Sequence, residues 1–158
     1  MSRAFIKEDS GAETLPERPV SAHRNLVTRR GLALIEAEIA RLRSALAEAG
    51  ASGDRDGVAR ASRDLRYWSA RRASAEPVDP PAGGAAITVG MAVTLEDEAG
   101  RRREWRIVGE DEADPRAGRI AWVSPVARAL LGREIGEAVE LPSGSAEIVA
   151  IDPHPEKA

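Results

Sequence analysis

The chain has 158 residues and a net charge of −3, a length that suits one domain or two small ones. It contains no cysteine, which excludes a disulfide framework and a thiolate zinc site. No apolar run approaches the ~20 residues of a membrane helix and no secretory signal opens the chain, so we expect a cytoplasmic protein without a membrane partner.

Charge is distributed unevenly along the chain. Residues 1–79 carry 14 basic against 12 acidic side chains, whereas residues 80–158 carry 9 against 14. This difference suggests two units with different partners. The basic excess of the first half is too small for a dedicated DNA-binding protein.

The first half predicts a mobile arm followed by a helical hairpin. Residues 1–25 show no apolar period, and we expect a mobile N-terminal arm there. Residues 26–76 form the predicted antiparallel hairpin. Thr28 is expected to cap the first helix and Asp54 the second. Two apolar seams with 3-4 spacing support the pairing: Leu32, Ile35, Ile39, Leu42 and Leu46, then Val58, Ala61, Leu65, Trp68 and Ala75, with Arg72 at the remaining seam position.

The second half predicts a sheet. Residues 77–86 have the composition of a linker, residues 87–152 the two-residue period of strands, and residues 153–158 form a tail. Within the sheet, Arg119–Leu131 reads as a strand that turns through Ser124 and Pro125 into a short amphipathic helix, with Ser124 as its cap. Four or five antiparallel strands with one short packed helix indicate the α+β class.

Several segments in the second half resemble the C-terminal domain of the bacterial GreA/GreB transcript-cleavage factors. These are Arg106–Gly109, Asp111-Glu112, Ser124–Gly132, Glu134–Gly136 and Pro142–Gly144. In the hairpin, Leu26–Gly31 with Leu34, Gly53–Arg55 and Arg66-Tyr67 are similar to the same family. The resemblance covers about residues 26–151.

The resemblance implies an FKBP-like C-terminal domain joined to an N-terminal coiled coil. It implies that the C-terminal domain docks at the secondary channel of RNA polymerase while the coiled coil enters the channel. Acidic residues at the tip then help to hold a second Mg²⁺ in the polymerase, which itself hydrolyses backtracked RNA. No cofactor belongs to the chain alone; Mg²⁺ would be held jointly with the polymerase.

The tip departs from the family pattern in two respects. Asp54 matches the family's tip aspartate, but the glutamate expected three residues later is Gly57, and the nearby acid is Asp56. Each arm is also about eight to ten residues shorter, which withdraws the tip by about 12–15 Å. We therefore expect a regulator that binds polymerase with weak or absent cleavage stimulation.

The resemblance and the motif spacing give a set of candidate contacts and no catalytic or metal-binding residue of the chain's own. We expect polymerase docking through Asp111, Glu112, Ser124, Pro125 and Arg128, a tip formed by Asp54 and Asp56, and RNA or polymerase contacts through Arg55, Arg60 and Arg63. The protein is expected to be a monomer that meets nucleic acid only through the transcription complex, and not an enzyme.

Other interpretations remain open at this point. The chain could be an active cleavage factor that uses Asp54 and Asp56, although capping and the helix dipole also explain both acids. It also resembles short-hairpin relatives linked to nucleoside diphosphate kinase. An FKBP-like peptidyl-prolyl isomerase would need an aromatic pocket, for which this half offers only Trp105 and Trp122.

Overall fold

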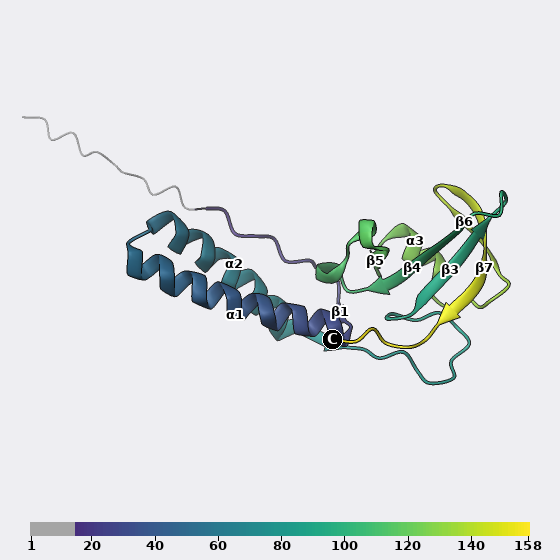
Figure 1. Cartoon of the computed structure of the whole chain (residues 1–158), viewed down its shortest axis with the longest axis horizontal. Coiled ribbons are helices and arrows are strands. Elements are labelled where there is room, and N and C mark those ends of the chain that lie inside the picture. Colours follow the sequence, from purple (N-terminus) through teal and green to yellow (C-terminus); the bar gives the residue numbers. More distant parts are fainter. Residues whose placement is uncertain (1–14) are drawn as a thin grey trace, which may run out of the picture.

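The computed structural model describes residues 15–158 and has two parts, a long helical hairpin and a curled sheet beside its base (Figure 1). The hairpin consists of α1 (Arg29–Ser52) and α2 (Arg55–Ser74). The sheet is built from β3 (Ala92–Asp97), β4 (Arg102–Val108), β5 (Arg119–Ala121), β6 (Ala138–Leu141) and β7 (Gly144–Asp152). The short helix α3 (Pro125–Leu130) covers part of one face. This arrangement confirms the α+β class.

The helix ends follow the expected capping chemistry. The Thr28 hydroxyl accepts a hydrogen bond from the Gly31 amide, and an Asp54 carboxylate oxygen accepts one from Gly57. Gly53 ends α1 in the left-handed conformation, with φ of 71°, which favours glycine. Ile35, Ile39, Leu42 and Ala61 are buried between the helices, as the two seams predict.

One seam position was predicted incorrectly. Arg72 is exposed and pairs with Glu36, whereas its neighbour Arg71 is buried. Arg71 faces Glu110 and Asp111, two residues that lie far away in the sequence and belong to the second half. The seam pattern describes only the contact between α1 and α2, so it could not reveal this partner.

A two-stranded sheet closes the hairpin at its base. β1 (Asn25–Val27) precedes α1, β2 (Ala75–Pro77) follows α2, and the two pair in parallel, with Leu26 opposite Glu76. The sequence pattern did not indicate these strands. Residues 15–24 were also expected to belong to the mobile arm. Glu17 pairs with Arg66 and Arg18 stacks on Tyr67, both on α2, and further along Ser21 donates a hydrogen bond to Glu110 of the second half. The rest of the expected arm, residues 1–14, lies outside the described residues.

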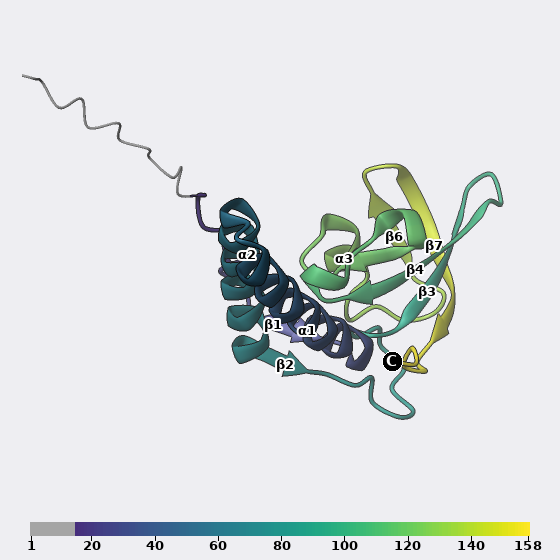
Figure 2. The same ribbon diagram turned by 60° about the vertical axis from the view of Figure 1, so that its left-hand side comes forward.

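The main sheet is mixed, whereas the sequence analysis predicted antiparallel strands only. Its strand order is β5-β4-β3-β7-β6, and β5 pairs with β4 in parallel. The chain reaches β5 through two 3-10 turns, η1 (Glu110–Glu112) and η2 (Pro115–Ala117), which carry it back beside the hairpin base before the strand begins. The acidic segment between β4 and β5 is therefore a structured crossover. Figure 2 shows the sheet curling around α3.

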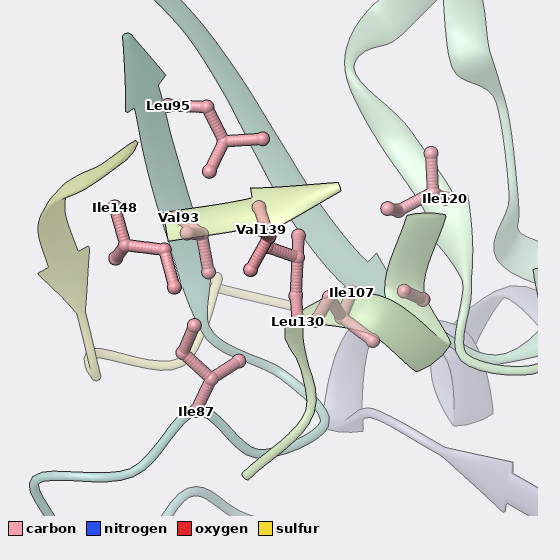
Figure 3. Packing of buried hydrophobic residues seen from close by; sticks show 9 residues of the cluster. Ile87, Val93, Leu95, Ile107, Ile120, Leu130, Val139 and Ile148 are labelled. Carbon is pink, nitrogen blue, oxygen red and sulfur yellow. The ribbon is translucent and has the colours of Figure 1, made fainter. Parts of the chain in front are cut away.

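The core of this part lies between the sheet and α3. Its labelled members in Figure 3 come from β3, β4, β5, β6, β7, α3 and the segment before β3, and include Val93, Ile107, Leu130 and Ile148, all fully buried. Trp105 and Trp122 pack against this cluster from its margin. α3 supplies Ala127 and Leu130, so a six-residue helix that is too short to be stable alone is held by packing.

Candidate functional site

The hairpin tip presents two exposed acids, Asp54 and Asp56, in different roles. Asp54 Oδ1 lies 2.9 Å from the Gly57 amide nitrogen, so this carboxylate caps α2. Asp56 lies in the first turn of α2, where the helix dipole favours a negative charge. A Cβ atom at position 57 would lie 2.2 Å from Asp54 Oδ2. The Asp54 carboxylate would therefore have to shift from this position if residue 57 carried a side chain, as it does in the family pattern.

The tip does not offer the donor set of a metal site. Within residues 15–158, no group of three or more His, Cys, Asp or Glu side chains could hold a metal ion. Mg²⁺ prefers several oxygen ligands in an octahedral arrangement. One carboxylate engaged in a cap and a second acid two residues later do not fit that requirement.

The three candidate arginines of α2 do not form one basic surface. Arg55 and Arg60 are exposed, and Arg63 is half-buried with its Nε 3.0 Å from Asp64 Oδ1. Arg60 borders a groove of about 560 Å³ between the two helices, whose lining also includes Asp54, Asp64 and Glu48. These acids offset the basic charge in the groove.

Asp111, one of the predicted docking residues, lies at the junction between the hairpin and the sheet. Its carboxylate accepts hydrogen bonds from the Tyr67 hydroxyl and from Arg71 Nε, which lies 2.5 Å away. The Arg71 side chain is 1% exposed and that of Asp111 is 9% exposed. Asn25 completes the cluster, because its Oδ1 accepts from Arg71 Nη2 at 2.7 Å and its Nδ2 donates to the Arg71 carbonyl.

Tyr67 is electrostatically coupled to this cluster. Burial of the phenol and its hydrogen bond to the Asp111 carboxylate raise the pKa of Tyr67 to about 12. Ionised Tyr67 would place a second negative charge beside Asp111. Tyr67 therefore remains a neutral hydrogen-bond donor to Asp111 up to a higher pH than an exposed tyrosine would.

Glu112, a second predicted docking residue, is also engaged within the molecule. Its side chain is 2% exposed, and it accepts hydrogen bonds from the Thr28 hydroxyl at 2.5 Å and from Arg30 Nη1 at 3.2 Å. A Cβ atom on Gly31 would lie 2.6 Å from Glu112 Oε2. The start of α1 thus approaches η1 so closely that a side chain at position 31 would have to displace the Glu112 carboxylate.

The remaining docking candidates lie at the start of α3. Ser124 caps the helix, with its Oγ 3.3 Å from the Ala127 amide nitrogen, and Pro125 occupies the first helical position. Pro125 and Arg128 are exposed. Asp111 and Glu112 therefore belong to the junction, and of the five docking candidates Pro125 and Arg128 present the most accessible side chains.

Arg71 and Asn25 complete the junction and could not be predicted from the sequence. The sequence contained only an indirect signal for this contact. Arg66-Tyr67 and Asp111-Glu112 both belong to the family resemblance, but they lie more than 40 positions apart. Gly109 is a further signal, because a Cβ atom there would lie 2.6 Å from the Leu26 carbonyl oxygen of β1. These contacts fix the hairpin base against the sheet.

Taken together, the fold and these contacts define a two-part α+β factor, in which a closed helical hairpin is fixed to a curled sheet by a buried polar junction. None of the helices in residues 15–158 combines the length and apolar character needed to cross a bilayer.

Comparisons with known proteins agree with this class. The family described as "Transcription elongation factor, GreA/GreB, C-term" matches residues 82–153. The chain is 36% identical over 137 residues to transcription elongation factor GreA of Desulfovibrio desulfuricans, covering 72% of this chain and 83% of that protein. It is 35% identical over 155 residues to GreA of Ruegeria pomeroyi, covering 80% and 96%.

A crystal structure of Gfh1 from Thermus aquaticus is 25% identical and covers 82% of this chain and 99% of that chain, with a TM-score of 0.39. The sequence similarities to the GreA proteins extend across both parts of the molecule. The chain belongs to the GreA/GreB family of transcription elongation factors.

Proposed function

We propose that this protein is an elongation regulator that binds RNA polymerase at its secondary channel and gives little or no stimulation of transcript cleavage. Membership of the GreA/GreB family supports the choice of partner. Any RNA cleavage in the complex would be catalysed by the polymerase, and this chain would reach nucleic acid only through that complex.

The observation that carries the low cleavage activity is the cap formed by Asp54. Its Oδ1 is bound to the Gly57 amide, and residue 57 supplies no second carboxylate. Asp56 cannot replace it on the same helix face, because residues two apart in a helix point in different directions. The donor set is therefore poorly suited to stabilising a second Mg²⁺.

Helix length supports the same conclusion. With 24 and 20 residues, α1 and α2 are about 36 and 30 Å long. Relative to the family pattern, the tip is withdrawn by about 12–15 Å, whereas a carboxylate must come within about 2 Å of Mg²⁺ to bind it. A hairpin of this length would occupy the channel entrance and compete there with longer factors.

We assign docking to the exposed surface at the start of α3, with Pro125 and Arg128 as its contact residues. Asp111 and Glu112 act indirectly in this proposal, by holding the hairpin at the orientation in which the sheet and the hairpin engage the polymerase together. Arg55 and Arg60 remain available on α2 for contacts inside the channel.

Co-purification with RNA polymerase tests the partner, with the Pro125→Ala/Arg128→Glu variant compared with an Arg116→Glu control that makes the same charge change at another exposed arginine. We expect the double variant to lose binding and the control to retain it. Equal binding by both variants would reject the docking surface, and no binding by the unaltered protein would reject the partner.

Cleavage is tested on stalled, backtracked transcription complexes. With this protein alone, we expect no Mg²⁺-dependent shortening of the RNA above the level of polymerase alone. When a full-length GreA is also present, we expect this protein to compete for the channel and so to reduce the cleavage that GreA stimulates. Efficient shortening that Asp54→Asn abolishes would show instead that the chain is an active cleavage factor. Because Asn also caps helices well, this substitution removes the charge and leaves the fold intact.

A further inference from the structure

The inner face of the sheet is only partly covered. α3 is six residues and about 9 Å long, whereas the six residues of β3 extend for about 20 Å. α3 packs against β5 and β6. Its residue Leu130 lies away from Leu95, which is close to the far end of β3 (Figure 3). A pocket of about 390 Å³ occupies this uncovered end, a volume within the range of ligand sites.

Strand register places the pocket on the same face as the core. Val93 pairs with Trp105 and Leu95 with Arg103, and residues directly opposite in a sheet share a face. Leu95, Trp105, Leu141 and Ala146 give the pocket an apolar floor that continues the core cluster. A floor of this kind favours a ligand with a bulky apolar group, which would displace water from it.

Arg101 and Arg103 border the pocket, whereas the side chain of Arg102, between them, lies on the opposite face of the sheet with Glu96. Arg101 binds Asp97 and Arg102 binds Glu96, at 2.8 and 2.6 Å. Arg103 makes no ion pair with the described residues; its guanidinium carbon lies 3.9 Å from the centre of the Trp105 ring. Arg103 thus has hydrogen-bond donors available above the apolar floor, at the position where a ligand carboxylate would bind.

The charge of the surrounding half limits what can bind. Residues 80–158 carry 9 basic and 14 acidic side chains, so most of this half repels an anion. Arg103 is a local exception, because the other arginine that borders the pocket, Arg101, is paired with the Asp97 carboxylate. An anionic ligand with an apolar group is therefore complementary to this pocket.

We propose that the pocket formed by Leu95, Arg103, Trp105, Leu141 and Ala146 binds an extended peptide segment of a partner protein that carries a bulky apolar side chain next to a carboxylate. The apolar side chain sits on the floor and the carboxylate accepts hydrogen bonds from Arg103. A peptide suits the site because the turns of two hairpins, β3–β4 and β6–β7, border it and leave the end of the sheet open between them. The site includes neither Pro125 nor Arg128, so it is separate from the proposed polymerase contact.

The test uses a fluorescein-labelled peptide with one Phe flanked by Glu residues, and the full chain. Fluorescence anisotropy gives the affinity for the peptide. The NMR signal of the Trp105 indole N–H, assigned with Trp105→Phe, reports whether the peptide binds in this pocket. We expect saturable binding that shifts this signal. Arg103→Glu should weaken binding at least about tenfold, or about 1.4 kcal/mol, and Arg116→Glu should change it less than about twofold.

Two further arms separate the contributions. Ala146→Leu fills the floor without a charge change and should also weaken binding, and replacing the peptide Phe by Ala should have the same effect. Equal losses in Arg103→Glu and Arg116→Glu, or an unmoved Trp105 signal, would overturn the proposal. Equally strong binding of 3-phenylpropionate would overturn the assignment to a peptide. Arg103 is exposed, and circular dichroism verifies that each variant is folded.

Discussion

The junction between the hairpin and the sheet makes a strong prediction for Asp111→Ala. In the unaltered protein, Asp111 pairs with Arg71 at 2.5 Å, and the Arg71 side chain is 1% exposed. Removing the carboxylate leaves a buried guanidinium with Asn25 as hydrogen-bond partner and Glu110 at 3.6 Å. The Tyr67 hydroxyl loses its acceptor in the same step.

Breaking a buried pair by removing one partner costs about 3–5 kcal/mol. Because Arg71 retains Asn25 and a distant Glu110, we expect a loss near the lower end, about 3 kcal/mol of the free energy of unfolding. For a chain of this size, this corresponds to a fall in Tm of about 6–12 °C. Total stabilities are about 5–15 kcal/mol, so the loss is a large fraction.

Thermal unfolding followed by circular dichroism measures the effect, and the exposed ion pair of Arg72 and Glu36 supplies the control. Arg72 pairs with Glu36 at 2.8 Å, and the two side chains are 48% and 51% exposed. Exposed pairs contribute about 0–1 kcal/mol, so Glu36→Ala should barely change Tm. If Asp111→Ala lowered Tm no more than Glu36→Ala did, the buried junction would not contribute as argued.

Two other predictions follow from the junction. Tyr67 is the single tyrosine of the chain, so absorbance at 295 nm reports it alone, and we expect ionisation near the raised pKa of about 12. Because the folded pKa exceeds the unfolded value of about 10, its stabilising contribution is present below pH 10 and lost as pH rises towards 12; ionisation near pH 10 in the folded protein would contradict this. Gly109→Ala should lower the free energy of unfolding by about 1–3 kcal/mol, because its Cβ atom would lie 2.6 Å from the Leu26 carbonyl oxygen. In α1, the Cβ atom of Gly50→Ala would meet no atom within 4 Å, so this control should raise the free energy of unfolding by about 0.5–1 kcal/mol. Urea unfolding compares the two variants, and equal stabilities would refute the close approach.

The sequence was sufficient to predict the elements whose causes are local. Thr28, Asp54 and Ser124 are caps in the structure because a short polar side chain reaches an amide three residues later. The seam containing Ile35, Ile39 and Leu42 is buried because it repeats at helical spacing. The residues that the resemblance identified in α3 and its cap also have a local structural explanation.

The features that depend on distant partners could not be predicted in this way. Asp111 and Glu112 look like a solvated acidic loop until α1 and α2 are placed against η1, where Arg71, Tyr67 and Thr28 meet them. The parallel pairing of β5 with β4 depends on the same crossover. Strands as short as β1 and β2, at three residues each, have no period to detect.

The closed base of the hairpin makes its attachment to the sheet independent of its length. β1, β2 and the contacts of Arg71 lock the first and last turns of the helical arms, whereas the turn at Gly53 packs against no part of the sheet (Figure 1). Matched deletions or insertions near that turn therefore leave the anchorage untouched. Each such change alters the length of the hairpin by about 5.4 Å per helical turn and leaves its attachment to the sheet unchanged.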